Sequence, residues 1–336
     1  QGEVSPAPGL TPDQARDLMS QALAQLQESQ PAWRQADLVR HLGELLPDDV
    51  ACPDDATAAT LLTGLADQVL AGAAGEQVLM LEAPEWPRVP DSLRRADGRS
   101  IYRPHSGTRY TTLAQLTMED RLVAQAQERG APRVEPGSAA RLLGADLAQL
   151  EAQLWARAQS HESAQPGTGS GLRLDQAAAA FLAVTSDRTA EVLVGPAGSG
   201  KTLTAAVVAS LWQQAGMGEV YGLTTSQAAR DVLHEAGVDL ASNTADFLGH
   251  LTGAREARGP KALRPGTLLL LDEASMMSMA DLAAIMRLAT ERHCRVLITG
   301  DHEQLAAVEG GGGMVMLARQ MGYIQLAEPV RFTQEW

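Results

Sequence analysis

Gly195-Pro-Ala-Gly-Ser-Gly-Lys201-Thr202 follows the apolar run 192–194 and precedes residues 204–211, whose composition predicts a helix. This stretch decides the fold. A strand, a glycine-rich loop and a helix in this order form a phosphate-binding loop. Glycines let backbone N–H groups turn inward, and the helix N-terminus adds the positive end of its dipole. The stretch therefore predicts an α/β fold that carries a phosphate site.

The polar side chains of this loop have distinct roles in such a site. The Lys201 ammonium would reach the β- and γ-phosphates of a nucleotide, and the Thr202 hydroxyl would hold Mg²⁺. A glycine-rich turn that arose by chance is the alternative, but composition argues against it. Lys201 and Lys261 are the only lysines among 27 basic residues, so lysine stands where a point charge suits phosphate. The expected nucleotide-binding residues of the loop are Gly195, Gly198, Ser199, Gly200, Lys201 and Thr202.

Length and composition limit the possible classes of protein. A chain of 336 residues, 45% hydrophobic and 20% charged, is typical of a soluble globular protein of about two domains. No apolar run is long enough to cross a membrane, and no signal segment opens the chain. Two cysteines, Cys52 and Cys294, are too few for a disulfide framework or a metal cluster, which favours the cytoplasm. The net charge of −14 argues against strong, salt-resistant binding of nucleic acid, although a local basic patch stays compatible with it.

Residues 1–164 are expected to form a mainly helical module. Thr11 and Pro12 are typical of a helix start, since a hydroxyl caps the first turn and proline suits the first helical position. The Asp97-Gly98 pair suits a tight hairpin turn. Helices, a strand and a hairpin in this order indicate a winged-helix-like module with a β-wing. The expected helices are one that begins at Pro12 and those at 34–46, 55–70, 117–129 and 138–160, and the expected β-elements are 78–81, 93–102 and 109–112.

The window 88–109 is basic within an acidic chain. It holds six arginines against two aspartates, and Tyr102 lies within it. Arginines and aromatic rings on a wing could grip a nucleic-acid backbone and stack on bases. A solvated hairpin face would have the same composition, so both interpretations stay open.

The second domain is expected at 172–336. The segment Gln165-Pro-Gly-Thr-Gly-Ser-Gly171 has the composition of a flexible linker, so we place the domain boundary at 165–171. Runs that are apolar on both faces imply central strands of a parallel sheet covered by helices. The expected interior strands are 192–194, 219–223, 268–271 and 296–299.

Two acids end one of these strands. Asp272 and Glu273 follow the apolar run 268–271 directly, at the edge where parallel sheets bind ligands. Asp272 could hold the water shell of Mg²⁺, and Glu273 could position and deprotonate an attacking water. The alternative is that both acids only cap a helix, which the glycine-rich loop upstream makes less plausible.

Two glutamines are further candidates for the site. Gln304, in Gly300-Asp-His-Glu-Gln304-Leu305, follows another expected strand and could contact both the γ-phosphate and a bound strand. Gln176 lies about twenty residues before the glycine-rich loop. Its amide has the paired donor and acceptor that match the adenine edge, although an isolated glutamine is a weak signal.

Taken in order, these motifs resemble those of superfamily 1 DNA helicases. The RecD-like branch is the most similar, and within it the helicase region of MobF-class conjugative relaxases, which also have an upstream segment similar to 33–112. The resemblance covers 172–336 closely and 1–165 weakly. The matching positions are Gln176, the loop 195–202, Thr224-Thr225, Asp272-Glu273, Gly300-Asp-x-x-Gln304-Leu305 and Arg331.

The resemblance implies a first RecA-like motor lobe over 172–336 that uses ATP and Mg²⁺. Arg331 is similar to the arginine that reaches the γ-phosphate in that family. Single-stranded DNA and other conjugative-transfer proteins are the implied partners, in the cytoplasm and without membrane insertion. Because the sequence stops at Trp336, we expect the second lobe to lie outside it. We therefore expect this stretch alone to hydrolyse ATP weakly or not at all.

Two other classes of function remain open at this point. The chain could be a P-loop ATPase or kinase that moves no nucleic acid, although the Gly-Asp-x-x-Gln-Leu run argues against this. It could also be a DNA-binding or recruitment module whose ATP site is incomplete. ATP hydrolysis with and without single-stranded DNA distinguishes these possibilities.

Overall fold

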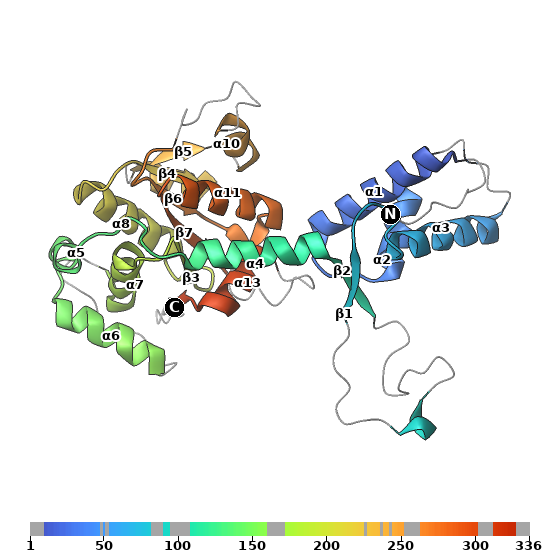
Figure 1. Ribbon diagram of the computed structural model, residues 1–336. Coiled ribbons are helices and arrows are strands. Elements are labelled where there is room, and N and C mark those ends of the chain that lie inside the picture. The colour runs from blue at the N-terminus through green and yellow to red at the C-terminus, as the bar shows by residue number, and fades with distance from the viewer. Residues whose placement is uncertain are drawn as a thin grey trace, which may run out of the picture. The chain divides into compact units, whose positions relative to one another are not determined.

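The chain forms two compact units, Gln1–Met118 and Glu119–Trp336. The division falls within the helix α4 (Leu113–Gln127) (Figure 1). The structure is a computed structural model that describes residues 10–47, 50, 54–81, 90–94, 108–159, 172–224, 227–235, 238–241, 244–251, 263–301 and 312–326.

Three helices form the core of the first unit. They are α1 (Pro12–Ser29), α2 (Gln35–Leu45) and α3 (Asp55–Leu70), close to the predicted limits. The Thr11 hydroxyl accepts a hydrogen bond from the Gln14 N–H at 3.3 Å, which caps α1 as its sequence indicates. The side chains that fill the core recur at helical spacing and include Leu23, Leu26, Leu38, Leu42 and Leu65.

A two-stranded antiparallel sheet completes the described part of this unit. β1 (Val78–Leu81) pairs with β2 (Arg109–Thr112), and Met80 lies opposite Tyr110. The ring of the buried Trp33 lies 5.5 Å from the Tyr110 ring, and their backbone groups exchange two hydrogen bonds of 3.0 and 2.7 Å. The short helix η1 (Asp91–Leu93) lies between the strands in sequence. Most of the expected hairpin 93–102 lies outside the described residues, so the winged-helix interpretation stays a prediction.

The helices that follow differ from the sequence prediction in two respects. The single helix predicted at 138–160 is two, α5 (Pro136–Leu143) and α6 (Leu147–Gln159), because Gly144 takes a left-handed conformation with φ 61° and ends α5. Buried residues of both helices belong to the core of the second unit, not to the first module. The structural division therefore precedes the predicted boundary at 165–171.

The second unit contains a parallel sheet of six strands in the order β5-β4-β6-β7-β3-β8. The four predicted interior strands correspond to β3, β4, β6 and β7. Every residue of β3, β6 and β7 is buried, as expected for strands covered on both faces. The predicted α/β class is confirmed. The strands are β3 (Ala190–Val194), β4 (Val220–Leu223), β5 (Asp239–Ala241), β6 (Leu268–Leu271), β7 (Arg295–Gly300) and β8 (Ile324–Gln325).

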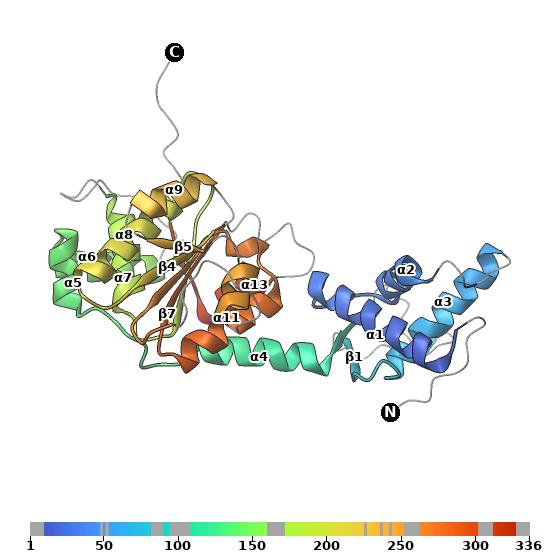
Figure 2. The same cartoon turned by 90° about the horizontal axis from the view of Figure 1, so that it is seen from above.

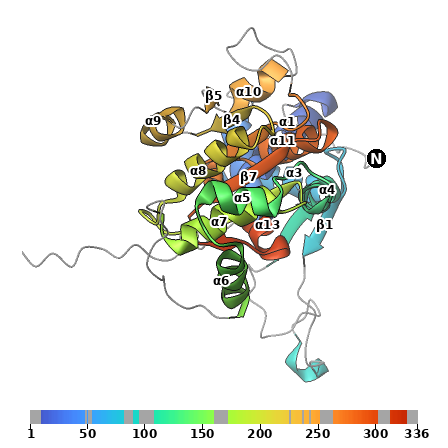
Figure 3. The same cartoon turned by 90° about the vertical axis from the view of Figure 1, so that its left-hand side faces the viewer.

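Helices cover both faces of this sheet. α7 (Leu174–Thr185) and α8 (Lys201–Gln214) lie side by side on one face, and α11 (Met279–Glu291) and α13 (Gly313–Met321) lie on the other (Figures 2 and 3). This arrangement brings the carboxyl ends of the parallel strands to one edge. The other described helices are α9 (Gln227–Glu235), α10 (Thr244–Leu251) and η2 (Ala274–Met276).

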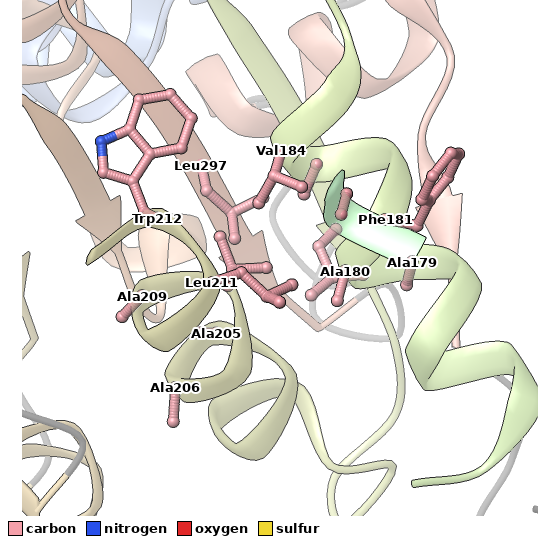
Figure 4. Close-up of a cluster of buried hydrophobic side chains, with 14 of the residues drawn as sticks. Ala179, Ala180, Phe181, Val184, Ala205, Ala206, Ala209, Leu211, Trp212 and Leu297 are labelled. Atoms are coloured by element: carbon pink, nitrogen blue, oxygen red, sulfur yellow. The ribbon is translucent and has the colours of Figure 1, made fainter. Parts of the chain in front are cut away.

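The core between α7, α8 and the sheet is rich in alanine. Small side chains on both helices let them approach each other closely, and larger side chains such as Leu211 and Leu297 fill the remaining space (Figure 4). Trp212 is fully buried, and its indole N–H donates to the Gly266 carbonyl at 2.8 Å. α8 therefore has a fixed position behind the glycine-rich loop.

Candidate nucleotide-binding site

The glycine-rich loop connects the end of β3 to the start of α8. Gly198 and Gly200 have φ of 77° and 90°, in the left-handed region that favours glycine. A Cβ atom on Gly195 would collide with the Ser199 hydroxyl, so this position also requires glycine. The Gly195 N–H donates to the Gly300 carbonyl at 3.2 Å, which ties the loop to the end of β7. The local geometry explains the glycines that the sequence singled out.

A cleft of about 380 Å³ opens at this edge of the sheet. Its volume lies within the range of small-molecule sites. Residues of the glycine-rich loop and of the segments that follow β6 and β7 line the cleft. Gln304 lies outside the described residues. The candidate site residues that line the cleft are Gly198, Gly200, Lys201, Thr202, Asp272 and Glu273.

Lys201 lines the cleft. Its ammonium donates to the carbonyl oxygens of Gly195 and Pro196, at 2.5 and 3.0 Å. Partial burial lowers the pKa of Lys201, while the nearby carboxylates, that of Asp301 foremost, oppose the shift. The loop carbonyls thus hold a positive charge in the cleft, where an anion would meet it.

Thr202 and Asp272 meet at the same cleft. The Thr202 hydroxyl donates to Oδ2 of Asp272 at 3.3 Å. The other oxygen of this buried carboxylate accepts hydrogen bonds from the Thr299 hydroxyl and from the Glu273 N–H, the latter at 3.1 Å. A hydroxyl and a carboxylate side by side are the hard oxygen ligands that Mg²⁺ uses together with water. These residues fit the ion, and their role as its ligands stays a prediction.

Glu273 has an unusual backbone conformation. Its φ of 56° and ψ of 36° lie in the left-handed region, which is rare for a residue with a Cβ atom. Among the described residues, His293 is the other non-glycine with a positive φ. Strained residues of this kind cluster at functional sites. The strained residue is therefore the one that the sequence analysis proposes as the general base. No sequence pattern indicated the strain.

Gln176 is buried against the loop. Its amide nitrogen donates to the Ser199 carbonyl at 3.2 Å, and its amide oxygen accepts from the Arg173 N–H at 3.2 Å. The side chain therefore reaches the predicted site, but both ends of its amide contact protein groups. Its role in adenine recognition stays a prediction.

Sequence reasoning did not single out Arg173 and Asp175. The Arg173 guanidinium donates two hydrogen bonds to the buried Asp175 carboxylate and one to the Ser199 carbonyl. In the sequence, the available signal was an acid two residues after an arginine at the start of a predicted helix. It is easily mistaken for a solvated helix cap.

The structure describes only some of the other residues that the sequence analysis proposes for the site. Asp301 is described and lines the cleft at the end of β7. Gln304 and Arg331 lie outside the described residues, as do Thr225 and most of the basic window. Their proposed roles stay predictions.

Part of the chain matches a known protein family. Residues 171–336 match the family described as an AAA domain. This region is similar to AAA domains. The match begins at the end of the predicted linker. It includes the glycine-rich loop, Asp272-Glu273, Gln304 and Arg331. The glycine-rich loop described above lies within the matched residues.

The relatives of the chain include conjugal transfer proteins and a helicase. The probable conjugal transfer protein TraA of Sinorhizobium fredii is 27% identical over 241 residues, which cover 68% of this chain and 21% of that protein. The ATP-dependent RecD2 DNA helicase of Deinococcus radiodurans is 31% identical over 147 residues, 42% of this chain and 19% of that protein. The multifunctional conjugation protein TraI of Escherichia coli K12 is 34% identical over 139 residues, 40% of this chain and 8% of that protein.

These relatives confirm, at low identity, the resemblance to RecD-like superfamily 1 helicases and to the helicase region of conjugative relaxases. The chain spans about a fifth of the length of the Sinorhizobium protein. In the part of the chain that the structure describes, no helix combines the length and apolarity needed to cross a membrane.

Proposed function

We propose that the AAA-like region binds ATP with Mg²⁺ and is the first motor lobe of a helicase that moves on single-stranded DNA during conjugative transfer. One observation carries the proposal. The Lys201 ammonium, the Thr202 hydroxyl and the Asp272 carboxylate surround a single cleft at the carboxyl edge of a parallel sheet. The names of the relatives support its extension to DNA and to conjugation.

The residues of the cleft divide the chemistry of ATP hydrolysis between them. The loop N–H groups and the Lys201 ammonium hold the phosphates at the N-terminus of α8. Thr202 and Asp272 would hold Mg²⁺, which would neutralise part of the charge on the phosphates. Glu273 orients the attacking water and accepts its proton.

Coupling to DNA rests on residues outside this cleft. We propose that Gln304 senses the γ-phosphate and a bound DNA strand, and that Arg331 stabilises charge on the transferred phosphoryl group. Other conjugative-transfer proteins are the proposed partners. We place the protein in the cytoplasm, in keeping with its two cysteines.

Steady-state ATP hydrolysis, measured with and without single-stranded DNA, tests the proposal. We expect slow hydrolysis that DNA stimulates and that Lys201→Ala abolishes. Arg287→Ala is the matched control, because Arg287 is exposed on α11 and pairs with Glu291. Hydrolysis that DNA leaves unchanged would instead indicate a P-loop ATPase that does not translocate. DNA binding without any nucleotide binding would indicate a recruitment module.

A further inference from the structure

The start of α7 holds one carbonyl group of the phosphate-binding loop. The Ser199 carbonyl oxygen accepts a hydrogen bond from Nη2 of Arg173 at 2.9 Å and another from Nε2 of Gln176 at 3.2 Å. Both donors come from the N-terminal end of the same helix. One loop carbonyl is therefore held by two side chains at once.

Both donors are themselves fixed in place. Nε and Nη2 of Arg173 donate to the two oxygens of Asp175, at 3.0 and 3.2 Å, and Asp175 is fully buried. This two-pronged pairing sets the plane of the guanidinium, so the second proton of Nη2 is aimed at the loop. The Gln176 amide is oriented by the Arg173 backbone N–H. Both side chains are therefore oriented towards the Ser199 carbonyl by their other hydrogen bonds.

The held carbonyl determines the direction of the next N–H group. The Ser199 C=O and the Gly200 N–H belong to one planar trans peptide group, so they point in opposite directions. The carbonyl points towards α7, and Gly200 lines the cleft. A Cβ atom on Gly200 would collide with the Gln176 amide, so this peptide lies directly against the glutamine. Fixing the carbonyl thus aims the Gly200 N–H into the cleft.

We infer that Arg173 and Gln176, with Asp175 behind them, are positioning residues that preset the phosphate-binding loop by holding the Ser199 carbonyl. The inference rests on the proposed function, since it requires nucleotide phosphates in the cleft. It gives Gln176 a role that does not depend on the base. It also gives Arg173 and Asp175 a role that the sequence did not indicate.

This positioning role affects all polyphosphate ligands alike. If the loop N–H groups no longer point into the cleft, the affinity for every polyphosphate falls, whichever base is attached. Loss of a hydrogen bond from a charged donor corresponds to about a tenfold loss of affinity. ATP, GTP and inorganic tripolyphosphate should therefore lose affinity by the same factor. A residue that reads adenine would change the affinity for ATP alone.

Arg173→Lys is the main variant. Lysine keeps a positive charge beside Asp175, but its ammonium lacks the planar fork that serves the carboxylate and the carbonyl together. Arg129→Lys is the matched control, because Arg129 pairs with Asp187 at 3.0 Å, just beyond the other end of α7. Gln176→Ala tests the second donor.

The three ligands are titrated into each variant, and thermal unfolding without ligand checks that each is folded. We expect Arg173→Lys and Gln176→Ala to weaken all three ligands about equally, roughly tenfold for Arg173→Lys, and Arg129→Lys to match the wild type. If Arg173→Lys unfolds, the double variant Arg173→Met with Asp175→Asn replaces it. That variant removes both charges, so no buried carboxylate is left without its partner.

Each other outcome is decisive. Wild-type affinity in Arg173→Lys, or in the double variant, overturns the positioning role of Arg173. Weakened ATP binding with unchanged GTP and tripolyphosphate binding in Gln176→Ala assigns that residue to base recognition and overturns its role here. If the wild-type protein binds none of the three ligands, the proposed function fails, which is a separate result.

Discussion

The backbone strain at Glu273 predicts an unusual pair of variants. A residue with a Cβ atom loses about 1–2 kcal/mol in the left-handed conformation that Glu273 adopts, because Cβ approaches the following carbonyl oxygen. Asparagine visits this conformation at lower cost, whereas glutamine retains the strain. We predict that the free energy of unfolding is about 1 kcal/mol larger for Glu273→Asn than for Glu273→Gln. For a domain of this size, that difference raises Tm by about 2–4 °C.

Thermal unfolding without nucleotide, followed by circular dichroism, measures this difference. Both variants should lose ATP hydrolysis, because neither side chain can accept a proton from water. His293→Asn is the control, since His293 has a φ of 51° but lies before β7, at the opposite end of that strand from the cleft. It should gain less stability, because histidine tolerates this conformation better than most residues, and it should keep activity. If Glu273→Asn is no more stable than Glu273→Gln, the conformation at Glu273 is not strained and this reasoning is wrong.

Three further predictions follow from the loop and from the buried thiol. Lys201→Ala should weaken ATP binding itself, whereas Glu273→Gln should leave affinity intact, and equal losses in equilibrium titrations would contradict these roles. Gly200→Ala and Gly216→Ala both place a Cβ atom at a positive φ, but only Gly200 lines the cleft, so only Gly200→Ala should weaken ATP binding. Burial raises the pKa of the Cys294 thiol to about 11, so the thiol is neutral below that pH. In a Cys52→Ser background, iodoacetamide should label Cys294 slowly at pH 8 unless the protein is first unfolded; rapid labelling of the native protein would be inconsistent with this burial.

The sheet and the edge that carries the candidate site were predictable because their signals are local. The four consecutive leucines of β6 are all buried, and the glycines at 198 and 200 take the positive φ that glycine adopts without strain. Parallel strands then bring their carboxyl ends together whatever the surrounding sequence. The approach of Thr202 to Asp272, 70 positions apart, follows from that topology.

Other features depend on tertiary contacts that no local pattern contains. The composition of 138–160 predicted a helix but not the domain against which α5 and α6 pack. The break at Gly144 could not be separated from a tolerated helical glycine. Arg173 resembles a surface residue in the sequence, and only the fold shows that its guanidinium reaches a carbonyl 26 positions away. The roles of Gln304 and Arg331 stay predictions.

Titration of ATP into the protein, in Mg²⁺ and in EDTA, tests the central claim most directly. The Thr202 hydroxyl and the Asp272 carboxylate lie 3.3 Å apart at the cleft, and Thr202→Val removes the hydroxyl while keeping the shape of the side chain. The account predicts that Mg²⁺ strengthens ATP binding to the wild type and that Thr202→Val loses most of this effect while keeping its affinity in EDTA. Equal affinity in Mg²⁺ and EDTA for the wild type, or an unchanged Mg²⁺ effect in Thr202→Val, would contradict it.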